Sequence, residues 1–493
     1  MRIMNNLEFR RQFLFTPKAC EDLQGWEVEK LQQHFLYIHP DCPHGKAIGK
    51  SEVYLIGYFV DPHSLSKSVI QETLDQISEE TSPTNISKII YPLVGRFVLI
   101  IKTHDNLLFF NDACGLKTIY YTKRDNVIYA ASQPLLLKKV IDINKCSYHD
   151  EYFNSKYVRN HLEHWLPSGL SLYEDVHQLV PNHYFTSAKN KQQRYWPSST
   201  LKKQDYESSL IKFKTLLKKI ITTAHDNMEM AFSFTAGWDS RILLSCCKDI
   251  KDELMFYTLK YRNITDKHPD LSITSKLAGS LGLSHHVFDC RRELDEDFIA
   301  IYRANTHISH IEDWGRIAYG MLNNYPEKRI ALKGNCSEVG RCYYYPTGKH
   351  SKNLKALDFI RLEKFWDELH FVRERVEEWF EEIKAEQNNR GYDLYDLFYW
   401  EHRMGSWQAQ SQLEWDIVQE VFTPFNSREL LDIMLAMDTS YRKANDYQLY
   451  QDTMKILWEE VLAEPINPLS MKKRTKKIVK NLYLRSRHFL NLQ

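Results

Sequence analysis

The stretch 235–240, TAGWDS, joins an apolar segment to one with apolar positions at helical spacing. A strand that ends in small residues and passes directly into a helix presents backbone N–H groups and the positive end of a helix dipole at one point. Ala236 and Gly237 would let a ligand approach the backbone, and the hydroxyls of Thr235 and Ser240 can donate to phosphate oxygens. This pattern predicts a phosphate-binding loop.

Asp239 in this stretch would repel a phosphate unless a cation lay between them. Its presence therefore indicates Mg²⁺ bridging the carboxylate and a polyphosphate. A structural interpretation is equally open for the loop alone, because Asp239 or Ser240 could simply cap the helix while Gly237 serves a tight turn.

A second stretch, RIALKGNCSEVGR at 329–341, is another apolar strand that runs into glycine, polar residues and an acid. Ligands of open α/β sheets bind beyond the carboxyl ends of the strands, so this loop should face the first one. We expect Glu338 to supply a second carboxylate to the same Mg²⁺, with Gly334, Asn335 and Ser337 at the nucleotide. A surface acid is the alternative for Glu338.

Strand and helix patterns elsewhere indicate how these loops are positioned. Residues 52–132 alternate short apolar strands with polar turns, which predicts a β-rich N-terminal domain with some helix. Residues 205–227 form a long amphipathic pattern, and strand and helix then alternate as in parallel βαβ units. The strand 254–260 could offer its edge, at Leu259, to a purine, and the chain from about 353 onward is mostly helical in pattern. The polar segment 196–199 is the expected junction, which gives domains 1–200 and 201–493.

Composition excludes several classes of protein. The 493 residues are 43% hydrophobic, enough for real cores, and 65 Lys and Arg nearly balance 64 Asp and Glu, so no large positive field for nucleic acid is present. Nine cysteines without a CxxC pair favour neither a disulfide framework nor a zinc ribbon. No apolar run approaches the length of a membrane span. We expect a soluble cytoplasmic protein that binds neither nucleic acid nor membrane.

The two loops carry a resemblance to a known family. TAGWDS resembles the SGGxDS loop of ATP-pyrophosphatases, and GNCSE resembles the later G-x-G-S-D loop of the asparagine synthetase branch. Residues 93–121 are similar to the glutaminase-type domain of that branch, and EVFTPF at 420–425 is similar to its late E-x-x-x-PF segment. The four motifs occur in the family's order over most of the chain.

This resemblance implies an α/β protein with two domains: an N-terminal Ntn-hydrolase-like α+β sandwich, and a doubly wound parallel-sheet ATP-pyrophosphatase domain, adenine nucleotide α-hydrolase-like, with a helical C-terminal part. It also implies an ATP- and Mg²⁺-dependent carbon–nitrogen ligase that adenylates a carboxylate, releases pyrophosphate and AMP, and forms an amide or lactam, as β-lactam synthetases and lasso-peptide cyclases do. The partners would be a small-molecule or peptide carboxylate and an amine. Peptide precursors, amino-acid derivatives and sugar acids are the substrate classes of similar proteins, and a homodimer is a candidate assembly.

The N-terminus departs from the family pattern. A working glutaminase of this type uses an N-terminal cysteine whose own amine is the base, but the chain begins MRIMNN and its first cysteine is Cys20. We therefore expect an N-terminal domain without glutaminase activity.

The chemistry also needs a cation beside the α-phosphate and the acyl oxygen. In the family a lysine after the PF segment has this role, and chain order points to Lys472 or Lys473 in NPLSMKKRTKK. The alternative is that this basic amphipathic stretch is a solvated helix face. Asn335 stands where relatives have a residue that handles the amine, so we assign it, with the two lysines, to the catalytic set.

Two other functions compete with the ligase. A tRNA-thiolating relative would need a basic RNA-binding face and reactive paired cysteines, and the sequence shows neither. A catalytically silent scaffold or partner-binding protein is the second, and the changes at Asn335 and Glu338 favour it.

Overall fold

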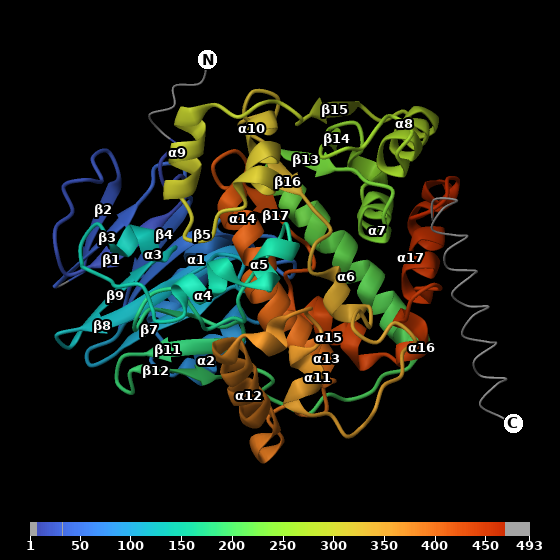
Figure 1. The fold of residues 1–493 in the computed structure, drawn as a ribbon. Coiled ribbons are helices and arrows are strands. Elements are labelled where there is room, and N and C mark those ends of the chain that lie inside the picture. Colours follow the sequence, from blue (N-terminus) through green and yellow to red (C-terminus); the bar gives the residue numbers. More distant parts are fainter. Residues whose placement is uncertain (1–6, 32, 469–493) are drawn as a thin grey trace, which may run out of the picture.

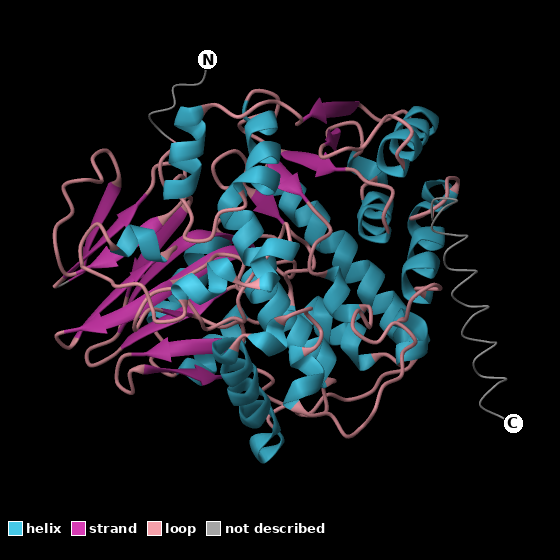
Figure 2. Cartoon of the chain, viewed as in Figure 1, coloured by secondary structure: helices cyan, strands magenta, loops and turns pink. Residues whose placement is uncertain are grey.

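The computed structural model describes residues 7–31 and 33–468 as an α/β protein with two antiparallel sheets and one parallel sheet. The antiparallel sheets lie on one side of the molecule, and the parallel sheet lies on the other among most of the helices (Figures 1 and 2). Lys472 and Lys473 lie outside the described residues. Among the described residues, no helix combines the length and the apolar character that a membrane crossing requires.

Each antiparallel sheet has six strands. In spatial order the first contains β10 (His177–Gln178), β8 (Tyr120–Arg124), β9 (Val127–Ala131), β1 (Phe13–Thr16), β3 (His34–Ile38) and β2 (Glu27–Leu31). The second contains β12 (Lys191–Arg194), β11 (His183–Thr186), β7 (Leu107–Asn111), β6 (Val94–Lys102), β5 (Glu52–Val60) and β4 (His44–Ile48). The strands predicted within residues 52–132 are thus confirmed as β5 to β9.

The two sheets pack face to face because alternate side chains of each strand point to the same side. Phe15 and Ile38 of the first sheet share one buried cluster with Ile56, Ile100 and Phe109 of the second. The other face of the second sheet carries a further cluster, covered by α1 (Val69–Ser78) and α2 (Pro83–Ile90). The far face of the first sheet packs against α3 (Pro134–Leu137), α4 (His149–Asn154) and α5 (Lys156–Asn160). The N-terminal half therefore has four layers, with the helices outside.

The parallel sheet has the order β15 (His285–Asp289), β14 (Met255–Lys260), β13 (Met230–Ser233), β16 (Ile330–Leu332) and β17 (Val421–Phe422). The chain moves from β13 outward to β15 and then returns to the other side of β13, so the strand order reverses between β13 and β16. In open parallel sheets this reversal is where ligands bind.

Helices cover both faces of the parallel sheet. On one face α6 (Tyr206–Asn227) and α7 (Trp238–Cys246) share a core with Phe232, and on the other α9 (Glu296–Ala304) and α10 (Arg316–Leu322) pack with Ala231 and Tyr257. α8 (Pro269–Leu281) connects β14 to β15. The helix predicted over 205–227 is confirmed, and Asp205 caps it by accepting the N–H of Ser208 at 2.8 Å.

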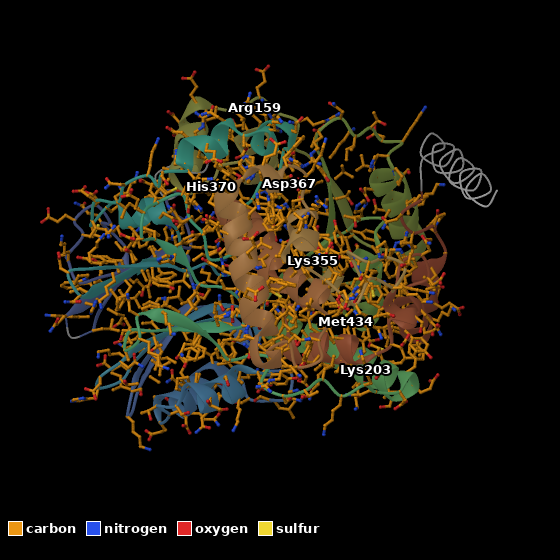
Figure 3. All side chains as sticks on the ribbon, turned by 60° about the horizontal axis from the view of Figure 1, so that its bottom comes forward. Arg159, Lys203, Lys355, Asp367, His370 and Met434 are labelled. Carbon is orange, nitrogen blue, oxygen red and sulfur yellow. The ribbon has the colours of Figure 1, made fainter. Side chains whose placement is uncertain are left out.

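The C-terminal part is helical, as its pattern predicted. Its helices are α11 (Ala356–Ile360), α12 (His370–Lys384), α13 (Leu394–Phe398), a π-helix (Tyr399–Gln408), α14 (Ala409–Trp415), α15 (Arg428–Ala436), α16 (Thr439–Arg442) and α17 (Gln448–Trp458). Figure 3 shows His370 at the start of α12, where the next residue, Phe371, stacks on Tyr148 of the N-terminal half.

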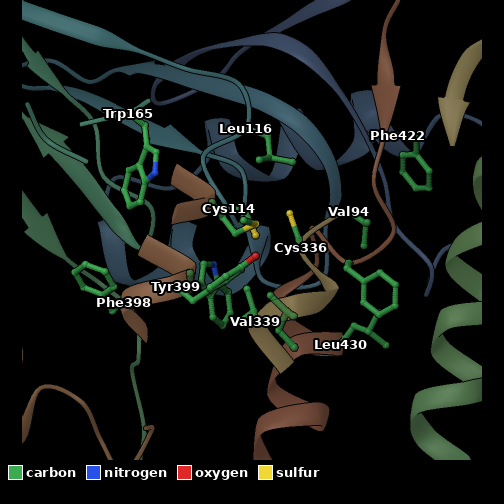
Figure 4. Close-up of a cluster of buried hydrophobic side chains, with 14 of the residues drawn as sticks. Val94, Cys114, Leu116, Trp165, Cys336, Val339, Phe398, Tyr399, Phe422 and Leu430 are labelled. Atoms are coloured by element: carbon green, nitrogen blue, oxygen red, sulfur yellow. The ribbon is translucent and has the colours of Figure 1, made fainter. Parts of the chain in front are cut away.

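The two halves of the chain share a charged and an apolar contact. Arg96 of β6 pairs with Asp416, with its Nη2 2.8 Å from Oδ2, and its Nη1 lies 3.0 Å from Glu420. In Figure 4 the thiols of Cys114 and Cys336 lie side by side within a buried cluster. Since Cys336 belongs to the loop after β16, the N-terminal half packs directly against one of the two predicted site loops.

Candidate functional site

The loop after β13 is held in shape by its own hydroxyl groups. The N–H of Thr235 donates to Ser240 Oγ at 3.0 Å, and the N–H of Gly237 donates to Thr235 Oγ1 at 3.3 Å. Gly237 is the N-cap of α7 and offers no side-chain cap, so the first-turn N–H groups of the helix have no partner inside it. This arrangement suits an anion at the start of α7.

One donor of this loop already has an acidic partner. The N–H of Ala236 donates at 3.0 Å to a carboxylate oxygen of Asp270, which lies in the first turn of α8. Asp270 was not among the predicted residues, and its position shows that the loop amides attract a negatively charged group.

The loop after β16 approaches the first loop through a glycine. A Cβ atom on Gly334 would lie 2.6 Å from the Cβ of Asp239, closer than real side chains come. Gly334 therefore allows the β16 loop to contact Asp239. This close contact is the reason for a glycine at the second position after the strand.

The structure brings Asp239 and Glu338 to the same point. Arg341 Nη2 lies 3.1 Å from Asp239 Oδ2 and 3.3 Å from Glu338 Oε1, so both carboxylates face one nitrogen. The Ser337 hydroxyl donates to the other oxygen of Asp239. The guanidinium of Arg341 lies against the ring of Tyr447, 5.2 Å from its centroid.

Electrostatics at this pair favour a further cation. Burial and the charge of Asp239 raise the pKa of Glu338 to about 7, although Arg341 acts in the opposite direction. Carboxylate and hydroxyl oxygens are ligands that suit Mg²⁺, which commonly takes one or two carboxylates together with substrate phosphates and water. Within residues 7–31 and 33–468 no group of three His, Cys, Asp or Glu side chains could hold a metal, so the substrate would have to supply further ligands.

A cavity of about 310 Å³ lies beside the two loops at the carboxyl ends of β13, β14 and β16. Of the predicted residues, Thr235, Leu259 and Asn335 line it. The other predicted residues that the structure describes are not among the lining residues of this cavity: Ala236, Gly237, Asp239, Ser240, Gly334, Ser337 and Glu338. The other lining residues are Glu163, Ser233, Thr258, Tyr261, Arg262, Asp270, Trp314, Ile317, Lys333, Trp407, Gln408, Ser411, Gln412 and Trp415.

Asn335 reaches across this cavity wall. Its side-chain amide donates to Gln408 Oε1 at 2.9 Å, which ties the β16 loop to the π-helix. The Asn335 amide can therefore form a hydrogen bond to a group in the cavity. It cannot act as a general acid or base there.

Lys333 and Arg341 are two further charged residues of the site that were not predicted. Lys333 is the first residue after β16, and Arg341 follows Glu338 by three positions. A cation that ends a buried strand directly before a glycine is a signal that could have pointed to Lys333. Nothing local distinguishes Arg341 from a surface arginine, because its partners come from three separate segments.

No family model and no curated protein sequence matches this chain. Among solved structures, NMN synthetase from Francisella tularensis is similar to it at 14% sequence identity and a TM-score of 0.20. The match covers 38% of this chain and 92% of that protein. At so low a TM-score the likeness supports neither a fold family nor a function for this chain.

Proposed function

We propose that the chain is an ATP-using enzyme that activates a carboxylate as its adenylate and passes the acyl group to an amine. The observation that carries this proposal is the meeting of Asp239 and Glu338 beside a cavity at the reversal point of the parallel sheet. Two acids, a helix N-terminus without a side-chain cap and an adjoining cavity are what a magnesium-bound polyphosphate requires.

The nucleotide would lie along the carboxyl ends of β13 and β14. The edge of β14 at Leu259 would receive the adenine, and Thr235, Ala236, Gly237 and Ser240 would surround the β- and γ-phosphates. Asp239 and Glu338 would hold Mg²⁺, which neutralises charge on the phosphates when it is bound. Asp270 would have to release the N–H of Ala236 when the phosphates arrive.

The reaction would proceed in two steps. A carboxylate oxygen of the substrate attacks the α-phosphorus of ATP, the bond to the β-phosphate oxygen breaks, and pyrophosphate leaves. An amine then attacks the acyl carbon, AMP leaves with the former carboxylate oxygen, and the amine loses one proton. Adenylation is needed because a free carboxylate has no suitable leaving group.

On this proposal the fold is that of the asparagine synthetase type. The four-layered N-terminal half would be the Ntn-hydrolase-like domain without glutaminase activity, and the parallel sheet would be the ATP-pyrophosphatase domain. Support for this assignment comes from the order of the motifs and from the layers around the sheets.

The test is to measure binding of Mg·ATP by calorimetry and pyrophosphate release with a panel of carboxylates. Asp239→Asn should abolish both, whereas Asp252→Asn, at a largely exposed acid, should change neither. A wild-type protein that binds no Mg·ATP would contradict the proposal.

A catalytically silent binding protein is the second candidate. Two contacts favour it, because in each a side chain of the protein takes a position that a ligand would need. Asp270 accepts the N–H of Ala236, and Arg341 lies between Asp239 and Glu338. Such a protein would show no pyrophosphate release with any carboxylate, and Asp239→Asn would leave its partner binding unchanged.

A further inference from the structure

Lys333 places an ammonium group in the wall of the cavity. Its backbone N–H donates to Phe422 of β17 at 3.0 Å, which fixes the residue to the sheet immediately after β16. The side chain is 9% exposed and lines the cavity, with Nζ 3.9 Å from the centroid of the Trp415 ring. The ammonium group therefore lies in the cavity lining, against the face of Trp415.

No carboxylate of the described residues pairs with this ammonium. The other charged groups of the cavity have partners: Arg262 Nε donates to Asp313 at 2.7 Å, its Nη2 pairs with Glu163, and Asp270 accepts the Ala236 N–H. Among residues 7–31 and 33–468 the Lys333 ammonium has only the face of Trp415 as a partner, and this cation–π contact offsets part of the cost of burial.

This burial is unfavourable for the folded protein. Removal from water lowers the pKa of Lys333 well below its usual value, and the positive charge of Arg96 acts in the same direction. A buried cation without a counterion destabilises a fold, whereas an apolar side chain of similar length would not. A purely structural role gives no reason for a lysine at this position.

We propose that Lys333 is the anion-binding group of the cavity, whose ammonium pairs with an oxyanion of the reacting centre, either the α-phosphate or the substrate carboxylate. This inference rests on the proposed function, because it assumes that the cavity holds the reactants. The group would stabilise the negative charge that gathers where the carboxylate attacks phosphorus. Lys333, directly after β16, would then have the role that the family resemblance assigned to Lys472 or Lys473.

The experiment compares Lys333→Met and Lys333→Arg with Lys117→Met. Lys117 is a matched control, because it is also buried but donates to the Arg11 carbonyl at 2.6 Å and is not among the residues that line the cavity. Calorimetry gives the affinities for adenosine, AMP, sodium acetate and sodium glucuronate, and thermal melting gives Tm.

If the α-phosphate is the partner, wild type should bind AMP about 10-fold more tightly than adenosine, because a charge-assisted hydrogen bond can supply the corresponding difference of about 1.4 kcal/mol. Lys333→Met should reduce this ratio to near unity, and Lys333→Arg should retain part of it. If the carboxylate is the partner, Lys333→Met should instead weaken acetate or glucuronate by a similar factor and leave the AMP ratio unchanged. In either case Lys333→Met should melt at or above the wild-type Tm, while Lys117→Met melts lower and keeps the wild-type ratios.

Three results would overturn the inference. The first is a Lys333→Met protein that binds all four probes as wild type does. The second is a wild type that binds neither AMP nor either carboxylate. The third is a Lys333→Met protein with a Tm several degrees below wild type, because that would make the ammonium structural. If Mg·ATP binds wild type and depends on Asp239, but Lys333→Met changes nothing, the role of Lys333 fails and the proposed function stands.

Discussion

Arg341 lies 3.1 Å from Asp239 through its Nη2 atom, although the two residues come from different loops of the parallel sheet. The same nitrogen is 3.3 Å from Glu338, so the chain provides a positive charge between its two predicted metal ligands. A charge fixed in this way lessens the repulsion between the carboxylates and leaves less for a metal ion to neutralise.

Arg341→Met should therefore make nucleotide binding more dependent on magnesium. Without the guanidinium the two acids repel each other and the phosphates, so we expect ATP affinity at low Mg²⁺ to fall by about 10-fold and to recover in part at high Mg²⁺. Arg341→Lys should show a smaller loss. Calorimetric titrations with ATP at several Mg²⁺ concentrations measure this, and an unchanged affinity at every concentration would show that Arg341 only supports the fold.

Gly334→Ala should disable the site with little effect on the rest of the protein. The added Cβ would lie 2.6 Å from the Cβ of Asp239 and force the two loops apart. A displacement of about 1 Å at a reacting group can lower a rate by about 100-fold, so pyrophosphate release should fall by that order. Gly279→Ala is the matched control, since an added Cβ there meets nothing within 4 Å on an exposed face of α8. This control should keep wild-type activity and melt slightly higher, as alanine is the better helix former.

Acid should destabilise the protein through His164. Burial, and to a lesser extent the charge of His310, lowers the pKa of His164 to about 3. The unfolded chain binds a proton near pH 6.5 and the folded chain does not, so stability falls as the pH drops below that value. Between about pH 7 and about pH 5 this amounts to about 2 kcal/mol. His164→Gln should therefore lose less Tm over this range than wild type does, and identical pH profiles would exclude His164 as the cause.

The protein should not hydrolyse glutamine. Cys20 is 7% exposed, its N–H donates to the Tyr37 hydroxyl at 2.8 Å, and burial raises the pKa of its thiol. Cleavage before Cys20 would also remove β1 from the first antiparallel sheet. We expect no glutamate release from glutamine in wild type or in Cys20→Ala, and detection of a mature protein that begins at Cys20 would contradict this.

Sequence patterns predicted the helices and strands of the fold better than the contacts between distant segments of the chain. The helix over 205–227, the strands of residues 52–132 and the alternation after residue 230 follow from hydrophobic spacing, and all appear in the structure. The meeting of the loops at Asp239 and Glu338 followed from one further rule, that parallel strands end at a common edge. The boundary near residue 200 stays a prediction.

The residues that sequence reasoning missed depend on contacts between distant segments. Asp270 reaches Ala236 from the start of another helix, and Arg341 is held by Asp239 and by Tyr447, more than a hundred residues away. Lys333 is buried and has no carboxylate partner among the described residues. A sequence does not show whether a buried lysine has a counterion.

The contact between Cys114 and Cys336 gives the N-terminal half a structural role at the loop after β16. Cys336 belongs to the loop after β16, the N–H of Cys114 donates to Asn426 at 2.8 Å, and Ala113 accepts the indole N–H of Trp400 at 2.8 Å. One turn of the N-terminal half thus contacts three segments of the other half: the loop after β16, the segment after β17 and the π-helix. Removing the N-terminal half would therefore take away the surface against which the loop after β16 packs, so the parallel sheet depends on that half for the shape of its loops.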